Sequence, residues 1–462
     1  NLMYKPLPKV KNMKLAGNDM LIQSLINEGV EYIFGYPGGA ALHIYDAIVK
    51  QKEMQHILVR HEQGATHAAD GYARATGKPG VVMVTSGPGA TNAITGIATA
   101  FMDSIPMIVI SGQVQSHLIG TDAFQETDMI GISRPIVKHS FTVDHQENIP
   151  TIVKEAFHIA TSGRQGPVVI DIPKDLTNPD ELFDYEYPKK VSIRSYNPPV
   201  EPEQNQVDRV ISALKESKRP VIYAGGGTIA SNASDELREL NSYIKVPVTN
   251  TLMGLGVYPG TDKYFLGMLG MHGTYQANMA MHNADLILAI GARFDDRITG
   301  KIDEFSPKSK KVHIDIDPSS INKIIKVDLA IVGDVDEVIK SAIKKINKKR
   351  NGLKDSNKQR ISKWWEQIQK WRTKDSLGFI NSDKEIKPQH AVKRLYELTK
   401  NQDTFITTEV GQHQMWAAQH YKFNKPNRWM TSGGLGTMGY GLPAAVGVQI
   451  AHPDKLAVSY TH

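Results

Sequence analysis

The sequence predicts an α/β protein built of three doubly wound parallel-sheet domains, the third of them incomplete. Short β-branched runs alternate with helical segments along most of the chain, which is the pattern of parallel sheets covered by helices on both faces. The length of 462 residues suffices for two or three domains, each with its own core. With 40% hydrophobic and 22% charged residues, the composition is that of a globular protein.

The first predicted domain covers residues 1–178. Runs of β-branched residues bounded by Gly, Pro or Ser predict strands at 30–34, 56–59, 80–85, 107–111 and 167–172. Apolar and small residues at helical spacing predict helices at 40–50, 62–76, 90–102 and 149–162. Beyond it, the change to proline, charge and tyrosine at 178–205 predicts a linker.

The second predicted domain covers residues 205–345, and the third covers 365–462. The second has expected strands at 220–224, 285–291 and 311–316. A polar linker is expected at 348–360, before a helix that carries Trp364 and Trp365. The third domain has expected helices at 390–400 and 412–420 and expected strands at 404–407 and 456–460. Doubly wound domains need roughly 100 to 200 residues, so we expect this domain, and both chain ends, to be cut short.

Composition excludes several classes of function. The chain has no cysteine, which rules out disulfides, thiolate metal sites and a cysteine nucleophile and fits a reducing compartment. No run approaches the roughly 20 apolar residues that span a bilayer, and the start lacks a secretion signal, so we expect a soluble, cytoplasmic protein without membrane contact. The net charge is +6, but the basic run at 344–350 lacks interleaved aromatic residues, so we expect no nucleic-acid partner.

Three strand-to-helix turns carry the first chemical signal. Residues 60–65 place Glu62 between a strand and a helix, and glycine-rich turns at 35–40 and 86–92 follow two other strands. Open α/β sheets bind ligands at the carboxyl ends of their strands, so these turns are expected to share a ligand-binding edge. Two structural alternatives stay open at this point. Glu62 could simply stabilise a helix start, and the glycines could simply permit tight packing.

Together these residues resemble the pyrimidine-binding domain of thiamine-diphosphate enzymes, and the resemblance extends over essentially the whole chain. It implies that Glu62 hydrogen-bonds N1′ of the aminopyrimidine and favours the imino tautomer, which then takes the proton from thiazolium C2. It also implies that the Gly39 N–H faces developing negative charge. Phe124 and Gln125 would lie near the substrate and thiazolium, and Lys174 would line the substrate channel. Phe124, Gln125 and Lys174 could also be ordinary surface, as could Arg164, which resembles an arginine at the flavin.

The third domain extends the resemblance through the segments 409–413 and 432–443. The implied thiamine-diphosphate contacts there are Val410, Gly411, Gln412, His413, Gly436 and Met438. The Gly436 carbonyl would receive the 4′-amino hydrogen, and Met438 would wedge the cofactor into its bent shape, which suits an apolar, adaptable thioether. Gln412 and His413 would lie near the diphosphate. A methionine in such a place can also be ordinary core.

Within this family, the middle domain resembles the biosynthetic, FAD-containing acetolactate synthases, on the segments 267–273 and 291–297. The catabolic type, which lacks FAD, departs from this pattern. The implied FAD contacts are Arg164, Gly225, Gly226, Thr251, Leu252, Leu269, Gly270, Met271, His272, Gly291, Ala292, Arg293, Asp295, Arg297, Asp315 and Asp334. Arg293 would meet the pyrophosphate, and Asp315 and Asp334 would lie at the adenosine end. Exposed ion pairs are the alternative for residues 293–297.

The expected metal ligands are absent. In this family the strand matching 456–460 leads into Gly-Asp-Gly and, further on, an Asn-Asn pair, and these residues hold the Mg²⁺ that bridges the diphosphate. Here only Thr461 and His462 follow Tyr460, so we assign no metal residue. We expect the chain as given to be inactive and impaired in assembly.

The resemblance implies an acetolactate synthase reaction in branched-chain amino-acid (valine, leucine and isoleucine) biosynthesis. Pyruvate would be decarboxylated and joined to a second pyruvate or to 2-oxobutanoate, with thiamine diphosphate, FAD and Mg²⁺ as cofactors. A homodimer or higher homo-oligomer and a separate regulatory small subunit are the expected partners. Two alternatives stay open: a pyruvate oxidase-like flavoenzyme of the same family, and a non-catalytic FAD-binding relative.

Overall fold

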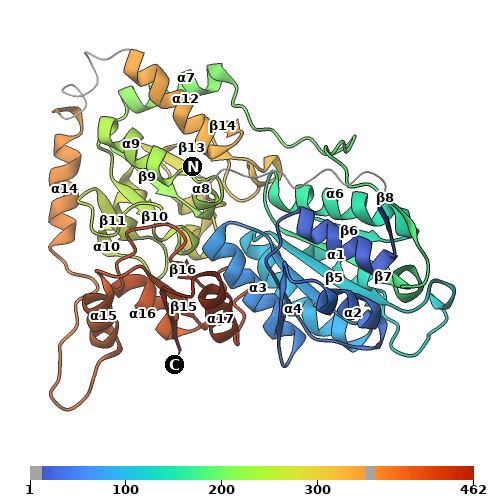
Figure 1. Cartoon of the computed structure of the whole chain (residues 1–462). Coiled ribbons are helices and arrows are strands. Elements are labelled where there is room, and N and C mark those ends of the chain that lie inside the picture. Colours follow the sequence, from blue (N-terminus) through green and yellow to red (C-terminus); the bar gives the residue numbers. More distant parts are fainter. Residues whose placement is uncertain (1–12, 349–358, 462) are drawn as a thin grey trace. The chain divides into compact units, whose positions relative to one another are not determined.

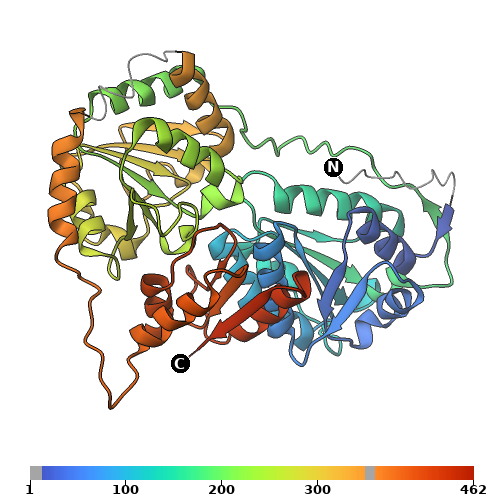
Figure 2. The same ribbon diagram turned by 60° about the vertical axis from the view of Figure 1, so that its left-hand side comes forward.

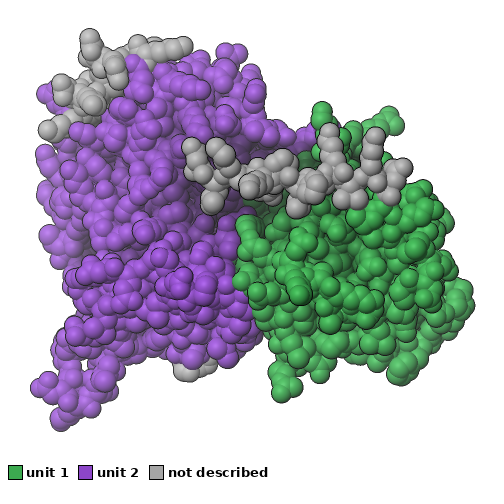
Figure 3. Space-filling model, viewed as in Figure 1, with its two compact units in different colours: residues 1–73, 78–196 green, residues 74–77, 197–462 purple. Residues whose placement is uncertain are grey.

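A computed structural model of the chain describes residues 13–348 and 359–461 (Figure 1). The chain divides into two compact units, coloured separately in Figure 3. The first unit comprises the residues up to Ala73 together with Lys78–Tyr196, and the second comprises Arg74–Gly77 with the residues from Asn197 onward. Within the described ranges, no helix has the length and apolar character needed to cross a membrane. Most of the predicted linker at 348–360 lies outside the described residues.

The first unit is built on a six-stranded sheet in the order β3-β2-β4-β5-β7-β6, in which all neighbouring strands are parallel. Its strands are β2 (Tyr32–Gly35), β3 (Gln55–Leu58), β4 (Gly80–Val84), β5 (Met107–Gln113), β6 (His139–Thr142) and β7 (Pro167–Pro173). From β2 the chain runs outward in one direction to β3 and in the other to β4. The switch point therefore lies between β2 and β4, where open α/β sheets bind ligands.

Helices cover both faces of this sheet, which confirms the doubly wound class. The helices α1 (Gly17–Asn27), α2 (Leu42–Lys50) and α6 (Ile149–Thr161) share one apolar core with alternate strand residues such as Ile108 and Ile110. The helices α3 (Glu62–Thr76), α4 (Pro88–Asp103) and α5 (Met129–Ser133) complete the layers of this unit (Figure 1). The helices α3 and α4 pack so closely that a Cβ at Gly96 would lie 1.7 Å from Thr66 Oγ1.

The predicted linker at 178–205 is wrong in part. Residues Phe183–Tyr185 form strand β8, which pairs antiparallel with β1 (Met13–Leu15). Phe183 and Tyr185 pack against the core of the first unit, and Asn27 Nδ2 donates to Tyr185 Oη at 2.8 Å. The alternating aromatic residues are the strand signal, which the surrounding proline and charge obscured.

The second unit contains another parallel six-stranded sheet, in the order β11-β10-β9-β12-β13-β14 (Figure 2). Its strands are β9 (Pro220–Ala224), β10 (Val248–Asn250), β11 (Phe265–Met268), β12 (Leu286–Ile290), β13 (Lys310–Asp315) and β14 (Leu329–Val332). One core includes residues of α7 (Gln204–Glu216), α9 (Ser234–Ile244) and α12 (Val335–Lys348), and another includes residues of α10 (Tyr275–Asn283) and α14 (Ser362–Arg372). The switch point lies between β9 and β12.

A three-stranded parallel sheet, β16-β15-β17, completes the second unit. It comprises β15 (Thr404–Thr408), β16 (Trp429–Met430) and β17 (Leu456–Tyr460), with the helices α15 (Pro388–Thr399), α16 (Gln412–His420) and α17 (Gly441–Ala451). Leu255 and Met268 from the middle region share an apolar cluster with Val392, Ile406 and Trp429. The small sheet is therefore packed against the middle domain within one unit.

Candidate functional site

The carboxyl edge of the first sheet collects the predicted catalytic residues. Gly39 follows β2, Glu62 follows β3, and Lys174 follows β7 directly. Phe124 and Gln125 lie on the segment that leaves β5. Because all six strands are parallel, these segments leave the same edge, and the turns after β2 and β4 flank the switch point.

Glu62 is a buried carboxylate with a defined orientation. It is the first residue of α3, it is 7% exposed, and Asn92 Nδ2 of α4 donates to its Oε2 at 2.9 Å. Burial raises the pKa of Tyr45, and the negative charge of Glu62 raises it further. A carboxylate at a helix start interacts favourably with the helix dipole.

Close packing requires two of the turn glycines near Glu62 but not the third. A Cβ at Gly89 would lie 2.7 Å from Thr85 Cγ2 and 3.4 Å from Glu62 Oε1, and a Cβ at Gly38 would lie within 2.8 Å of three Thr85 atoms. Tight packing therefore explains these two glycines. Gly39 differs, since a Cβ there would meet nothing within 4 Å. The absence of a side chain at Gly39 leaves open space at the switch point, as a bound ligand would require.

The segment at 114–128 presents an exposed aromatic residue beside this edge. Phe124 is 89% exposed, and Gln125 has a left-handed backbone with φ 61°. A Cβ at Gly87 would lie 2.7 Å from the Gln125 carbonyl oxygen, so this segment lies against the turn after β4. The Glu126 carboxylate braces it by accepting from the N–H groups of Gly120 and Ala123, which lowers the pKa of Glu126.

Lys174 belongs to the same edge, whereas Arg164 does not. The neighbour of Lys174, Asp175, accepts from Ser116 N at 2.8 Å, which ties the turn after β7 to the segment at 114–128. Arg164 precedes β7 and donates from Nε to Ser104 Oγ at 2.8 Å, at the amino edge of the sheet. The structure therefore does not group Arg164 with the catalytic candidates.

The carboxyl edge of the small sheet carries the thiamine-diphosphate residues predicted in the third domain. Residues 410–413 follow β15, and Gly436 and Met438 follow β16. The backbone of Gly411 has φ 143° and that of Gly436 has φ 77°, conformations that favour glycine. A Cβ at Gly436 would lie 4.0 Å from Val410 Cγ1, so the two segments meet. Met438 is 63% exposed, and His413 is buried with its ring 5.7 Å from that of Tyr460.

Glu409 holds this edge together. Its carboxylate accepts hydrogen bonds from three successive backbone N–H groups at the start of α17, those of Gly439, Tyr440 (3.1 Å) and Gly441 (2.8 Å). A negative charge in this position satisfies donors that have no partner within the helix. Glu409 therefore fixes the end of the segment that carries Gly436 and Met438.

The predicted FAD residues of the second unit share one sheet edge as well. Gly225 and Gly226 follow β9, and Gly291 and Arg293 follow β12, on either side of the switch point. Thr251 and Leu252 follow β10, residues 269–272 follow β11, Asp315 ends β13, and Asp334 follows β14. This edge is where doubly wound sheets bind dinucleotides.

Not every residue of this FAD set presents a side chain. Leu269 and Ala292 are buried in the core, so a ligand could meet only their backbone. Gly225 and Gly291 pack against each other, since a Cβ at Gly225 would lie 2.3 Å from the Gly291 carbonyl oxygen. Met271, Arg293 and Arg297 are substantially exposed. Arg293 Nη2 donates to Asp295 Oδ2 at 2.8 Å. This pair matches the alternative interpretation of residues 293–297 as exposed ion pairs.

Three family models match separate parts of the chain. Residues 15–132 match "Thiamine pyrophosphate enzyme, N-terminal TPP binding domain", 207–342 match "Thiamine pyrophosphate enzyme, central domain", and 409–461 match "Thiamine pyrophosphate enzyme, C-terminal TPP binding domain". Thiamine pyrophosphate is thiamine diphosphate. The two TPP binding matches contain Glu62 and the segment 410–438, respectively.

Curated relatives are similar over almost all of the chain. The acetolactate synthase large subunit of Haemophilus influenzae is 54% identical over 448 residues, which cover 97% of this chain and 77% of the relative. The acetolactate synthase isozyme 3 large subunit of Escherichia coli is 52% identical over 447 residues, with the same coverage. The chain belongs to the acetolactate synthase large-subunit family. The chloroplastic acetolactate synthase of Arabidopsis thaliana is 45% identical over 442 residues, which cover 96% of this chain and 65% of the relative.

Membership of the acetolactate synthase family makes the chain a thiamine pyrophosphate enzyme.

Three residues to which the sequence interpretation gave no role also lie at the predicted sites. Asn92 orients Glu62, and Glu409 caps α17. Asn250 ends β10, and neither polar atom of its buried amide has a hydrogen-bond partner among the described residues. An orphaned amide at the predicted dinucleotide edge fits a site that binds a polar group. The sequence signal was only an amide at the end of an apolar strand.

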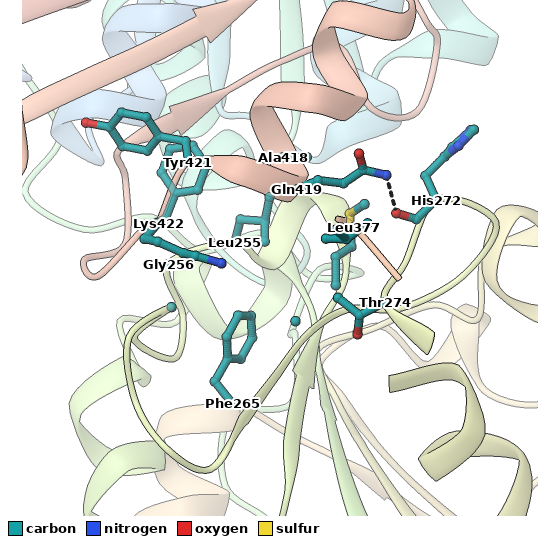
Figure 4. Close-up of a pocket in the computed structure, with 14 residues that line it drawn as sticks. Leu255, Gly256, Phe265, His272, Thr274, Leu377, Ala418, Gln419, Tyr421 and Lys422 are labelled. Atoms are coloured by element: carbon teal, nitrogen blue, oxygen red, sulfur yellow. Dashed lines mark hydrogen bonds between the residues drawn. The ribbon is translucent and has the colours of Figure 1, made fainter. Parts of the chain in front are cut away.

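A small pocket lies within the second unit of this acetolactate synthase family member, between the middle region and α16. Its volume is about 30 Å³, and it is lined by Phe265, Lys422 and Gln419 among others (Figure 4). Gln419 Nε2 donates to the His272 carbonyl at 2.8 Å across it. The volume admits only a few water molecules, so the pocket is too small for either organic cofactor.

A buried carboxyl group in the first unit leads to a pH-dependence prediction. Burial raises the pKa of Asp171 to about 7, the hydrogen bond from Gln113 opposes the rise, and the Asp128 carboxylate adds to it. Because the folded state then holds the proton more tightly than the unfolded chain, the stability contributed by this proton is complete below about pH 4. It is lost as the pH rises towards 7. We expect the difference in unfolding free energy between wild type and Asp171→Asn to fall by roughly 3 to 5 kcal/mol over this window.

Urea unfolding of both proteins at several pH values measures this difference. Above pH 7 the difference should level off. A difference that stays constant between pH 4 and 7 would show that Asp171 titrates near its ordinary value.

Proposed function

We propose that the chain catalyses the acetolactate synthase reaction. Pyruvate loses CO₂, and the remaining two-carbon unit is joined to the keto carbon of a second pyruvate or of 2-oxobutanoate. The observation that carries the proposal is the buried, Asn92-oriented carboxylate of Glu62 at the switch point of a TPP binding domain. Bound thiamine diphosphate supplies the carbon nucleophile and accepts the electron pair that loss of CO₂ leaves behind.

Each candidate catalytic residue of the first unit has a distinct role in this proposal. Glu62 holds a proton at the ring nitrogen of the aminopyrimidine, and the hydrogen bond from Asn92 leaves its second oxygen, Oε1, on the side of Gly89. The Gly39 N–H donates to negative charge that develops on the substrate oxygen. Phe124 and Gln125 contact the substrate and exclude water, and Lys174 attracts the keto-acid carboxylate.

The third-domain residues have separate roles in binding the cofactor. The Gly436 carbonyl accepts from the aminopyrimidine, and Met438, whose side chain is exposed, supports the ring. Residues 410–413 lie at the start of α16, where N–H groups favour a diphosphate. We further propose a homodimer or higher homo-oligomer, a separate regulatory small subunit and a cytoplasmic location.

We assign FAD to the carboxyl edge of the middle sheet. The Arg293 guanidinium, held by Asp295, is suited to paired phosphate oxygens. The Asn250 amide, which has no hydrogen-bond partner among the described residues, favours a polar ligand at this edge. Burial raises the pKa of Asp334, whose carboxyl we place with Asp315 at the adenosine end. Arg164, which belongs to the first unit, stays a prediction as a flavin contact.

This assignment predicts that Arg293→Ala weakens FAD binding by about 10- to 100-fold, because it removes a charge-assisted hydrogen bond worth about 1.5 to 3 kcal/mol. Titration of the flavin-free chain with FAD, followed by flavin fluorescence, measures the change. Replacing the exposed Arg238 of α9 by alanine is the matched control and should leave the affinity unchanged. Equal affinities for wild type and Arg293→Ala would return Arg293 to the role of a surface ion pair.

Mg²⁺ is the third proposed cofactor, as the usual companion of a diphosphate. Residues 13–348 and 359–461 contain no group of three or more His, Asp or Glu side chains that could hold a metal ion. We therefore assign Mg²⁺ no ligand among them.

The test of the proposed reaction is formation of acetolactate from pyruvate with thiamine diphosphate, Mg²⁺ and FAD supplied and no external electron acceptor. Acetolactate and CO₂ in a one-to-one ratio are expected. Consumption of an added electron acceptor with release of acetate or acetyl phosphate would instead identify an oxidase. Binding of FAD without any turnover of pyruvate would favour a non-catalytic role.

A further inference from the structure

Asp171 is a carboxyl group inside an otherwise apolar strand. It lies in β7, is 3% exposed, and has the buried neighbours Val169, Ile170 and Ile172. Gln113 Nε2 donates to its Oδ2 at 3.1 Å, and within the described part of the chain its Oδ1 has no hydrogen-bond partner. The nearby Ser111 hydroxyl donates to the Gly112 carbonyl instead. A carboxyl in this place costs free energy that an apolar residue would not, so stability of the core does not explain it.

The partner of Asp171 controls both ends of a functional segment. Gln113 is the last residue of β5 and is 4% exposed. Its Oε1 accepts from Val114 N at 2.8 Å, and its Nε2 donates to the Thr127 carbonyl at 2.8 Å as well as to Asp171. Gln113 therefore closes the segment at 114–128 at its first residue and next to its last.

Asp171 adds a third contact to the two that already orient the Gln113 amide. A side-chain amide can turn so that its oxygen and nitrogen exchange places. Asp171 Oδ2 is an acceptor, so it draws the NH₂ group to the side where the Thr127 carbonyl also needs a donor. Without Asp171, one of the three contacts that oppose the turned amide is lost, and that turned amide would place its oxygen against the Thr127 carbonyl.

The segment needs this anchoring because its backbone is strained. Asp122 and Gln125 both have left-handed conformations, with φ 57° and 61°. Such conformations persist in residues other than glycine only where the surroundings hold them. Phe124, between them in the chain, is almost fully exposed and does not anchor the segment through its own packing.

We propose that Asp171 is a positioning residue, which orients the Gln113 amide and through it holds the segment that presents Phe124 and Gln125. The proposal rests on the proposed function in one respect, that these two residues contact the substrate. The anchoring itself can be measured without turnover.

Hydrogen exchange of the intact chain tests the anchoring. Asp171→Leu should speed exchange of the amides at 114–128 by about tenfold, which corresponds to loss of about one hydrogen bond. Asp171→Asn should restore the wild-type rate, because the asparagine carbonyl accepts the same bond from Gln113. Gln113→Leu should reproduce the effect of Asp171→Leu, and the double variant should exchange no faster than Gln113→Leu alone.

The matched control is Val169→Ala, two residues earlier on the same face of β7 and equally buried. It should lower the overall stability without selective exchange at 114–128. Equal loosening in this control, failure of Asp171→Asn to restore the rate, or additive effects in the double variant would overturn the proposal. If Asp171→Leu does not fold, the test rests on Gln113→Leu alone. Exchange of the amides at 114–128 at the wild-type rate in Gln113→Leu would then overturn the proposal.

Turnover provides a second readout. With pyruvate as substrate, Asp171→Leu should raise KM by about tenfold with a smaller change in kcat, since the segment binds substrate rather than activating the cofactor. A fall in kcat at unchanged KM would contradict this role. If the wild type forms no acetolactate, the proposed function fails, while the exchange measurements still decide whether Asp171 positions the segment.

Discussion

Replacing Glu62 by glutamine is expected to lower acetolactate formation by about 10²- to 10⁴-fold while the fold stays intact. The amide has nearly the same shape and can still lie beside Asn92, but it carries no negative charge to hold a proton at the aminopyrimidine nitrogen. Steady-state rates at saturating thiamine diphosphate measure the loss, and circular dichroism checks the fold. The effect should fall mainly on kcat, because activation of the cofactor precedes every turnover.

Glu53→Gln is the control for this substitution. Glu53 is an exposed carboxylate in the same unit, and its replacement should leave the rate unchanged. The rate of Asn92→Ala is expected to lie between those of Glu62→Gln and Glu53→Gln. This substitution keeps the Glu62 carboxylate but removes the hydrogen bond that orients it. Turnover of Glu62→Gln within a few-fold of wild type would remove Glu62 from the mechanism and leave it as a helix-start residue.

Replacing Glu409 by alanine is expected to weaken thiamine-diphosphate binding by about 100-fold or more. Three backbone N–H groups at the start of α17 lose their acceptor, and hydrogen bonds to a charged group are worth about 1.5 to 3 kcal/mol each. The segment that carries Gly436 and Met438 would then lose its fixed end. Calorimetric titration with thiamine diphosphate and Mg²⁺ measures the affinity.

The exposed carboxylate of Glu397 on α15 provides the matched comparison, and Glu397→Ala should bind the cofactor as wild type does. Glu409→Gln should be intermediate, since its amide oxygen can replace only part of the carboxylate. Wild-type affinity of Glu409→Ala for thiamine diphosphate would mean that the segment carrying Gly436 and Met438 keeps its conformation without the Glu409 carboxylate.

Local patterns were sufficient for the elements with clear boundaries. The predicted bounds 62–76, 220–224, 412–420 and 456–460 agree with α3, β9, α16 and β17. These elements have periodic apolar residues and are bounded by turns that stop the pattern. The strands β1, β6, β10, β11, β14 and β16 were not predicted, because runs of two to four residues carry little periodicity to distinguish them from a loop.

The sequence by itself determined where the chemical groups stand along the chain. With the exception of Arg164, the predicted site residues lie at or after the carboxyl ends of strands. Parallel topology then places them at common edges, so the fold class and the ligand edges followed from local order. Turn glycines and strand-end carboxylates are local features, and the sequence could show them directly.

Only the tertiary structure decided which side chains support those groups. Asn92 lies 30 residues from Glu62, the N–H groups of 439–441 lie 30 to 32 residues from Glu409, and Asp171 lies 58 residues from Gln113. Such pairs form when separate strands and helices pack, and no periodicity in the chain encodes them. The same packing decided that Gly89 is required by Thr85 while Gly39 faces open space. The positions of chemical groups follow local sequence, whereas their orientation depends on contacts between distant segments.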